Sequence, residues 1–335
     1  MRFFISNDID LENKDWTPIG KEKPAASAKS SYNNKPEDAF GFGGVFDGQN
    51  HTIKNLKVVK NGDFPANNMF CALFGIILPG TTIKNLTIEN AELSGYLYIG
   101  AFVGEIVNAD ATPGQPVSLE NLKLTGEASI VSLNGEGCIG GILGRSESLS
   151  SALTIKDCIV AVAGSSEINV TSRGVFSTFG GGIVGAAYGA AGTTMSGCSS
   201  NISVSGEIQG IGGLAGLFWN GTIVDCHVNA PKIELKHYEN DVWYDSHAVG
   251  GFIGCTGKTG ISIDGSSTCT TTIHAYVADT ASAPLFNKGL VGAVREPSGD
   301  GTPYQKADSS DYVTIDQNFD YSGIVIENTF EPSVD

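Results

Sequence analysis

The sequence predicts an all-β fold, a right-handed parallel β-helix of about seven coils with a cap at each end, on three observations. Two short motifs alternate along the chain, and a repeat period of about 20–50 residues is typical of solenoids and related arrays. Glycine accounts for 44 of 335 residues without a Gly-X-Y period, which excludes collagen. No segment shows helical periodicity, and no apolar run reaches the roughly 18 residues that a membrane-spanning helix needs.

The first motif reads apolar-x-(Asn/Asp/Gly)-(Leu/Cys). Its apolar positions would lie on opposite faces of a straight strand, so they share one face only if the backbone bends between them. Asn, Asp and Gly tolerate the positive φ of such a bend at least cost. Each copy therefore predicts two strands joined by a left-handed corner, and stacked corners predict a ladder of Asn side chains. The copies are Ile53–Leu56, Ile83–Leu86, Leu119–Leu122, Ile155–Cys158, Met195–Cys198 and Ile223–Cys226.

The second motif reads Gly-apolar-apolar-Gly and predicts a further strand, with glycines where neighbouring backbone or a large Phe crowds the corner. Variable spacing between copies is expected, because insertions in solenoids are confined to the corners. A β-propeller is the alternative, but its hairpin-linked blades need turn signals that are missing here. The copies, some with Ala in the first position, are Ala72–Gly75, Ala101–Gly104, Gly141–Gly144, Gly182–Gly185, Gly213–Gly216, Gly251–Gly254 and Gly289–Gly292.

The motifs divide the chain into three parts. Residues 46–292 hold the repeats, residues 1–45 are predicted to form an N-terminal cap with a Lys- and Ser-rich loop at 21–35, and residues 293–335 a C-terminal cap. Terminal repeats must cover the open ends of a solenoid, which otherwise present unpaired strand edges. Within the C-terminal cap, residues 312–315 and 323–326 are expected to form short strands.

Charge and cysteine content narrow the range of functions that the sequence allows. The formal net charge of −16 argues against nucleic acid, because phosphate binding needs a basic face. The seven cysteines form no CxxC pair and show no zinc-site spacing, so neither a metal nor a cofactor is predicted. Three of them, Cys158, Cys198 and Cys226, occupy one motif position, which predicts small core residues instead of a disulfide framework.

The opening blocks Ser6–Leu11, Trp16–Gly20 and Phe46–Ile53 resemble the start of a GLUG-motif domain, and the second motif resembles the GLUG motif itself. The resemblance covers about residues 5 to 292. The family occurs in large bacterial surface and secreted proteins, mostly described as adhesins, and some of its repeats flank the protease domain of immunoglobulin A-cleaving enzymes. The resemblance implies an exported, adhesin-like β-helix at the cell surface or outside the cell. It implies no binding residues.

We expect a non-enzymatic cell-adhesion module that binds a glycan or a host protein through loops on one face of the β-helix. The alternative is a structural stalk within a larger surface protein; in either case the chain is a monomer or a segment. A polysaccharide lyase or hydrolase is less favoured, because no arginine neighbours an Asp cluster. Asp157 and Asp225 are also poor catalytic carboxylates, since their motif position accepts Asn and Gly.

The longest insertion, Lys232–His247, is the predicted ligand-binding segment. Tryptophan and tyrosine rings beside carboxylates suit a sugar, which stacks on rings and hydrogen-bonds through its hydroxyls. The other interpretation is that these rings pin the loop against the helix wall. His237 and His247 could join the aspartates in a metal site, but no calcium-binding repeat accompanies them. The candidate binding residues are Trp243, Tyr244, Tyr238, Asp241, Asp245 and, one corner earlier, Trp219.

Overall fold

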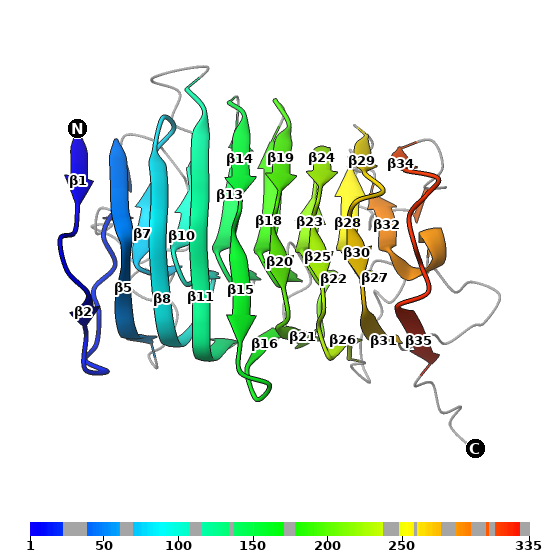
Figure 1. The fold of residues 1–335 in the computed structure, drawn as a ribbon, viewed down its shortest axis with the longest axis horizontal. Coiled ribbons are helices and arrows are strands. Elements are labelled where there is room, and N and C mark those ends of the chain that lie inside the picture. The colour runs from blue at the N-terminus through cyan, green and yellow to red at the C-terminus, as the bar shows by residue number, and fades with distance from the viewer. Residues whose placement is uncertain are drawn as a thin grey trace, which may run out of the picture.

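The chain folds as a parallel β-helix, as predicted, with its coils stacked along the long axis of the molecule (Figure 1). The structure is a computed structural model of residues 1–335. It describes residues 1–22, 39–60, 70–107, 115–133, 137–149, 151–170, 178–189, 191–236, 248–257, 260–275, 286–295, 306–307 and 312–328. These parts contain no α-helix, only the 3-10 turn η3 (Phe286–Gly289). Among the helices described, none is long and apolar enough to cross a membrane.

Three sheets form the walls. The large sheet, toward the viewer in Figure 1, has 19 strands. They are β1 (Arg2–Phe4), β2 (Ile9–Asp10), β5 (Val45–Val59), β8 (Thr82–Gly95), β11 (Val117–Ser132), β14 (Leu153–Lys156), β15 (Ile159–Val162), β16 (Glu167–Val170), β19 (Thr193–Ser196), β20 (Ser199–Ser200), β21 (Ser203–Gly206), β24 (Gly221–Val224), β25 (His227–Val228), β26 (Lys232–Leu235), β29 (Ile261–Ile263), β30 (Thr268–Cys269), β31 (Thr271–Ala275), β34 (Val313–Ile315) and β35 (Ile324–Asn328).

Two smaller sheets close each coil. The middle sheet has seven parallel strands and the antiparallel β33 (Lys306–Ala307), and the small sheet has six strands. The seven parallel strands match the predicted number of coils. The middle sheet holds β7 (Phe74–Ile77), β10 (Val103–Ile106), β13 (Leu143–Leu149), β18 (Val184–Gly189), β23 (Ala215–Phe218), β28 (Ile253–Gly257) and β32 (Val291–Arg295); the small sheet holds β6 (Phe70–Cys71), β9 (Tyr98–Gly100), β12 (Cys138–Gly140), β17 (Phe179–Gly181), β22 (Gly210–Gly212) and β27 (Ala248–Gly250).

The predicted left-handed corners lie in the large sheet. Asn85, Asn121, Asp157, Gly197 and Asp225 have φ values of 53°, 49°, 53°, 62° and 51°. The amide of Asn121 donates to Oδ1 of Asn85 over 3.0 Å. The Asn side chains therefore form the predicted ladder, which satisfies polar groups that the bend turns away from the sheet.

The copy at Ile53–Leu56 belongs to a different corner from the one its sequence suggests. Lys54 pairs with Glu89, so Asn55 (φ 59°) stacks on Asn90 (φ 63°) at a second corner and not on Asn85. The amide of Asn90 donates to Oδ1 of Asn55 over 3.1 Å. The register shifts between Asp47 and His51 because β5 carries extra residues at the first corner. Both corners need positive φ, so both select the same residue types.

We expect Asn121→Ala to lower the free energy of unfolding by about 2–4 kcal/mol. A left-handed Ala costs about 1–2 kcal/mol, and the lost amide hydrogen bonds to Asn85 and Asn50 contribute about 1 kcal/mol each. Asn121→Gly removes the same bonds without the steric cost, so its loss is smaller. Urea unfolding of both variants measures the difference. Equal losses of unfolding free energy in the two variants would show that the positive φ does not determine which residue occupies the corner.

The second motif forms a corner and the start of a strand, in agreement with the prediction of a strand whose glycines lie at a crowded corner. Its first two residues bend the chain from the small sheet to the middle sheet, and its last two begin the middle-sheet strand. A Cβ on Gly144 would lie 2.6 Å from the carbonyl oxygen of Gly104 and 2.7 Å from the backbone nitrogen of Ile99, both in the preceding coil. The closing glycines are therefore required where backbones of successive coils meet, as the sequence predicted.

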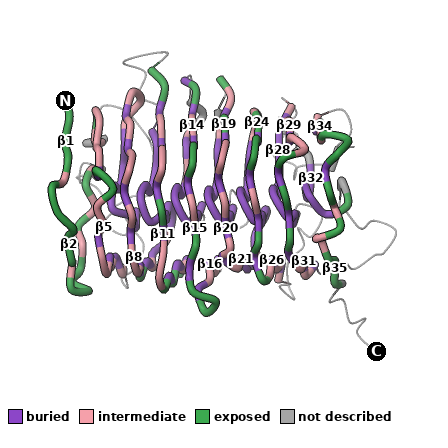
Figure 2. Tube along the Cα trace, in the orientation of Figure 1, coloured by how far each residue is buried: buried purple, intermediate pink, exposed green. Residues whose placement is uncertain are grey.

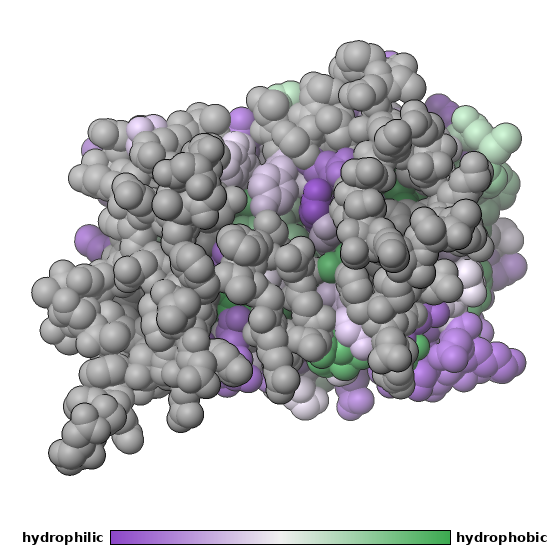
Figure 3. Space-filling model, turned by 180° about the vertical axis from the view of Figure 1, so that it is seen from behind, coloured by the Kyte–Doolittle hydropathy of each residue, from purple (hydrophilic) through white to green (hydrophobic). Residues whose placement is uncertain are grey.

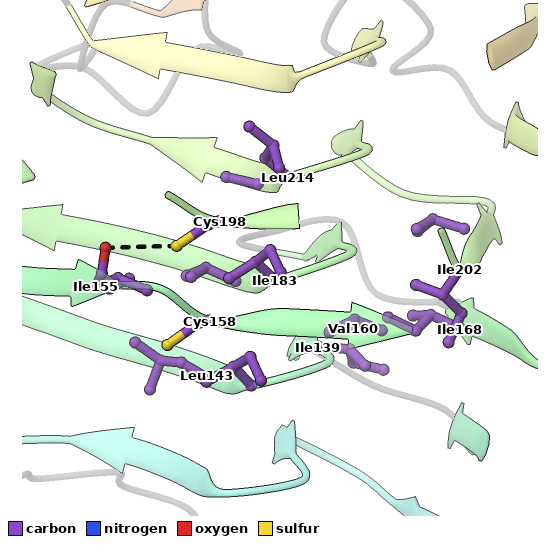
Figure 4. Close-up of a cluster of buried hydrophobic side chains, with 14 of the residues drawn as sticks. Ile139, Leu143, Ile155, Cys158, Val160, Ile168, Ile183, Cys198, Ile202 and Leu214 are labelled. Carbon is purple, nitrogen blue, oxygen red and sulfur yellow. Dashed lines mark hydrogen bonds between the residues drawn. The ribbon is translucent and has the colours of Figure 1, made fainter. Parts of the chain in front are cut away.

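The core runs the length of the solenoid between the three sheets, and buried residues line the inside of the coils (Figure 2). Cys158, Cys198 and Cys226 are fully buried in it. The Sγ of Cys198 donates to the carbonyl oxygen of Ile155 in the preceding coil (Figure 4). Burial raises the pKa of Cys71 to about 12. All seven cysteines are buried and free, so the prediction that the motif cysteines are core residues is confirmed.

Short strands extend the large sheet at both ends. At the N-terminal end, Arg2 pairs with Val45 and Ile9 with Ile53, so β1 and β2 lie parallel to β5. At the other end β34 and β35 confirm the two short strands predicted after residue 311. The predicted loop at 21–35 lies, from residue 23 on, outside the described residues.

Candidate functional site

The residues that directly follow the closing glycines form one row on the outer face of the middle sheet. The apolar members of this row belong to a second hydrophobic cluster, separate from the core inside the coils. Five members of the row are apolar and two, Glu105 and Arg145, are charged. A charged pair in a row that other coils fill with apolar side chains needs an explanation. In register, the row is Ile76, Glu105, Arg145, Ala186, Leu217, Cys255 and Ala293.

The second cluster fills the angle between the middle and small sheets. The sharp bend of the second motif turns the outer faces of these two sheets toward each other. Phe70, Tyr98, Cys138 and Phe179 from the small sheet pack with the row. On this side of the molecule, seen from behind in Figure 3, hydrophobic surface shows among the hydrophilic side chains of the described residues.

Arg145 is the centre of the site. Its Nε lies 3.6 Å from a carboxylate oxygen of Glu105, and its Nη2 lies 3.5 Å from one of Glu147. Its Nη1 also donates to the hydroxyl of Tyr98. Glu105 is 0% exposed, whereas the side chains of Arg145 and Glu147 are 21% and 15% exposed. A carboxylate buried as deeply as Glu105 requires a cation beside it, because an isolated buried charge is strongly disfavoured.

Aromatic rings continue the site on both sides of Arg145. Its guanidinium lies over the Tyr98 ring at 4.8 Å and near the Tyr188 ring at 5.9 Å, both within the range of cation–π attraction. The rings of Tyr188 and Trp219 are 5.9 Å apart at an interplanar angle of 34°. Phe70 contacts Tyr98 with centroids 5.9 Å apart. We call Phe70, Tyr98, Arg145, Tyr188 and Trp219, which come from successive coils, the aromatic–arginine ladder.

The members of the ladder differ in how far they are exposed to solvent. Phe70 and Tyr98 are buried, whereas Arg145, Tyr188 and Trp219 are half-buried. A Cβ on Gly257 would lie 2.7 Å from Cδ2 and Cε2 of Trp219, so this glycine makes room for the indole. The accessible surface of the ladder therefore joins one guanidinium to two aromatic side chains.

The structure describes one of the six binding residues predicted from the sequence. Trp219 follows β23 and lies in the ladder, packed on Tyr188. Its role in binding stays a prediction. The other five, Tyr238, Asp241, Trp243, Tyr244 and Asp245, lie outside the described residues, as do His237 and His247. Within the described ranges, no group of three or more His, Cys, Asp or Glu side chains could hold a metal ion.

Sequence reasoning missed Arg145, Glu105, Tyr98 and Tyr188. No Asp cluster accompanies Arg145 in the sequence, but the fold brings two glutamates to it, one from the preceding coil. A signal was present: Glu105 and Arg145 each follow the closing glycine of their motif. An alignment of the seven copies on that glycine shows two charges in an otherwise apolar column.

Comparison with known proteins gives two similarities, and no family model matches the chain. Halomucin from Haloquadratum walsbyi is 29% identical over 150 residues, which is 42% of this chain and 1% of halomucin. The crystal structure of a "putative immunoglobulin A1 protease" from Bacteroides ovatus covers 76% of this chain and 77% of its own, with 18% identity and a TM-score of 0.41.

The second comparison corrects one prediction. The sequence led us to expect a protein that is not an enzyme, and this is contradicted by a structural neighbour that carries the name of a protease. The prediction is therefore withdrawn. At a TM-score of 0.41 the likeness carries no argument about a reaction or about the residues that would perform it.

Proposed function

We propose that this chain is a binding module of an exported bacterial surface protein and that it takes a glycan on the aromatic–arginine ladder. The resemblance to GLUG-motif domains supports an adhesin-like protein outside the cell. The similarity to halomucin, a mucin by name, favours the same location. We also propose the division into caps at 1–45 and 293–335 around the repeats at 46–292.

The observation that carries the proposal is the pair Glu105–Arg145 in an apolar row. A buried ion pair gives little or no stability relative to well-packed apolar side chains of similar volume. The equivalent positions of the neighbouring coils are Ile76 and Ala186, so other coils of the same sheet fill this position without a charge. Recognition of a ligand does explain the pair, because aromatic faces and a few fixed polar groups are the usual means of binding a sugar.

The test is glycan binding by the parent chain and a Trp219→Leu variant, on a glycan array and then by titration calorimetry. Leucine keeps the packing on Tyr188 but removes the flat ring, so affinity is expected to fall by about tenfold or more. Phe4→Ala is the matched control, because Phe4 is 66% exposed at the N-terminal end and lies outside the ladder. A Trp243→Ala/Tyr244→Ala variant tests the predicted loop in the same experiment.

Two results would contradict the proposal. Binding that survives in Trp219→Leu would place the site elsewhere on the chain. No binding by the parent would favour the structural-stalk alternative, which predicts no ligand at the ladder.

A further inference from the structure

We infer that copies of this chain stack end to end along the axis of the β-helix, with the C-terminal end of one copy on the N-terminal end of the next. This interaction goes beyond the proposed function, because it involves the two ends of the solenoid and not the aromatic–arginine ladder. It replaces the expectation of a monomer. The strands concerned are β1 and β2 at one end of the long axis and β34 and β35 at the other (Figure 1).

One apolar row on the inner side of the large sheet has partly exposed side chains at both of its ends. Its members from Ile83 to Ile263 are at most 2% exposed, whereas Phe3 is 40% exposed and Ile315 is half-buried. A further coil on each open side would bury these two side chains, and burial of apolar surface drives association. In register, the row is Phe3, Phe46, Ile83, Leu119, Ile155, Met195, Ile223, Ile263 and Ile315.

Other inner positions of the end strands are open in the same way. Ile326 of β35 is 44% exposed, whereas Ile273, with which it pairs in the preceding coil, is 0% exposed. Ile9 of β2 is 38% exposed, and its partner Ile53 in β5 is 5% exposed. Exposed large apolar side chains of the described residues are therefore concentrated at the two ends, which is typical of an interaction surface. The exceptions are Leu133 and Val224.

The strands that hold these residues are edge strands of the large sheet. Among the described residues, β1 and β2 pair with β5 alone, while β34 pairs with β29 alone and β35 with β31 alone. Each of them therefore has an open side on which its backbone groups can bond to another strand. All four pairings are parallel, so β34 of one copy and β1 of the next have the same direction when the two copies point the same way along the axis.

The two ends also have steps that fit each other. At the N-terminal end the large sheet extends one coil further than the middle sheet, because β1 and β2 precede β5, whereas Ile19 and Phe42, which bridge to β7, lie at the level of β5. At the C-terminal end the middle sheet extends one strand further, because β33 follows β32 there while the large sheet ends at β34 and β35. The protruding sheet of one end therefore meets the recessed sheet of the other, which identifies a second copy as the partner.

Contacts of this kind repeat the contact between successive coils within one chain. They join two different surfaces, so each added copy leaves one N-terminal and one C-terminal end open, and the assembly grows as a filament. Two N-terminal ends would bring protruding sheet against protruding sheet and would not fit.

The experiment measures self-association of the full chain by sedimentation velocity between about 1 μM and 1 mM, with electron microscopy of the products. Phe3→Glu and Ile9→Glu alter the N-terminal end, and Ile326→Glu alters the C-terminal end. Val224→Glu is the matched control, because Val224 is 40% exposed but lies in the middle of the solenoid. We expect filaments of the parent and of Val224→Glu, and association weakened by at least about tenfold in the end variants. Urea unfolding confirms that each variant keeps its fold.

A mixture of two end variants tests the direction of stacking. Phe3→Glu keeps an intact C-terminal end and Ile326→Glu keeps an intact N-terminal end, so one contact can form between them and the outer ends of the pair are blocked. We expect dimers in the equimolar mixture and monomers of each variant alone at the same concentration. Dimers of either variant alone would show that like ends meet, and would overturn the head-to-tail arrangement.

Two further results would overturn the inference as a whole. The first is a parent chain that stays monomeric over the full concentration range. The second is association that is as strong in Phe3→Glu, Ile9→Glu and Ile326→Glu as in Val224→Glu. Neither result would affect the proposed function, which is tested separately by glycan binding of the Trp219→Leu variant.

Discussion

Gly185→Ala is expected to abolish folding or to lower the free energy of unfolding by about 4 kcal/mol or more. Gly185 closes the second motif of its coil. A Cβ there would lie 2.3 Å from the backbone nitrogen of Ile139 and 2.5 Å from the carbonyl oxygen of Gly144. Both atoms are backbone of the preceding coil, so neither a rotamer change nor a side-chain shift relieves the clash. Two coils would have to separate, which breaks sheet hydrogen bonds on both sides of the corner.

Gly164→Ala is the matched control for this prediction. A Cβ on Gly164 meets no heavy atom within 4 Å. The free energy of unfolding of this variant is therefore expected to stay within about 0.5 kcal/mol of that of the parent. Soluble yield and urea unfolding measure both variants. A Gly185→Ala protein as stable as Gly164→Ala would mean that the closing glycines do not hold successive coils in contact.

Arg145→Met is expected to lower the free energy of unfolding by about 3–5 kcal/mol, because it removes the guanidinium that lies 3.6 Å from the buried carboxylate of Glu105. Methionine preserves much of the apolar volume, so lost packing contributes little. Lys57→Met is the control. Lys57 pairs with Glu92 over 2.9 Å, but both side chains are substantially exposed, and an exposed pair contributes only about 0–1 kcal/mol.

Urea unfolding at neutral pH compares the two variants. Equal losses for Arg145→Met and Lys57→Met would mean that Glu105 is compensated without Arg145. In that case the ion pair would not be the centre of the site.

The corners of the fold could be predicted from the sequence because their cause is local. A bend with positive φ selects Asn, Asp or Gly at one position, and Asn85, Asn121 and Asp225 all have that conformation. The same local cause explains the error at Asn55. Two different corners make the same demand, and only the pairing of Lys54 with Glu89 shows which corner Asn55 occupies. That pairing depends on how many extra residues β5 carries at the first corner, and a four-residue motif contains no information about that number.

The ladder could not be predicted in the same way, because its contacts join residues from 28 to 47 positions apart. Arg145 meets Glu105 only after two coils are stacked with their closing glycines in register. Tyr188 reaches Trp219 by the same stacking one coil further on. Trp219 could be predicted from its residue type alone. Glu105 and Arg145 can be recognised only when the copies of the second motif are aligned, because they are the two charged residues in an otherwise apolar row.

If the Glu105–Arg145 pair is kept for a ligand and not for the fold, its replacement by apolar side chains separates stability from binding. The double variant Glu105→Leu/Arg145→Leu shows this when its free energy of unfolding and its glycan binding are both measured. Leucine matches the apolar members of the row. We therefore predict a free energy of unfolding within about 1 kcal/mol of that of the parent, together with loss of glycan binding. A double variant that loses several kcal/mol of stability, or one that still binds the glycan as the parent does, would contradict the claim.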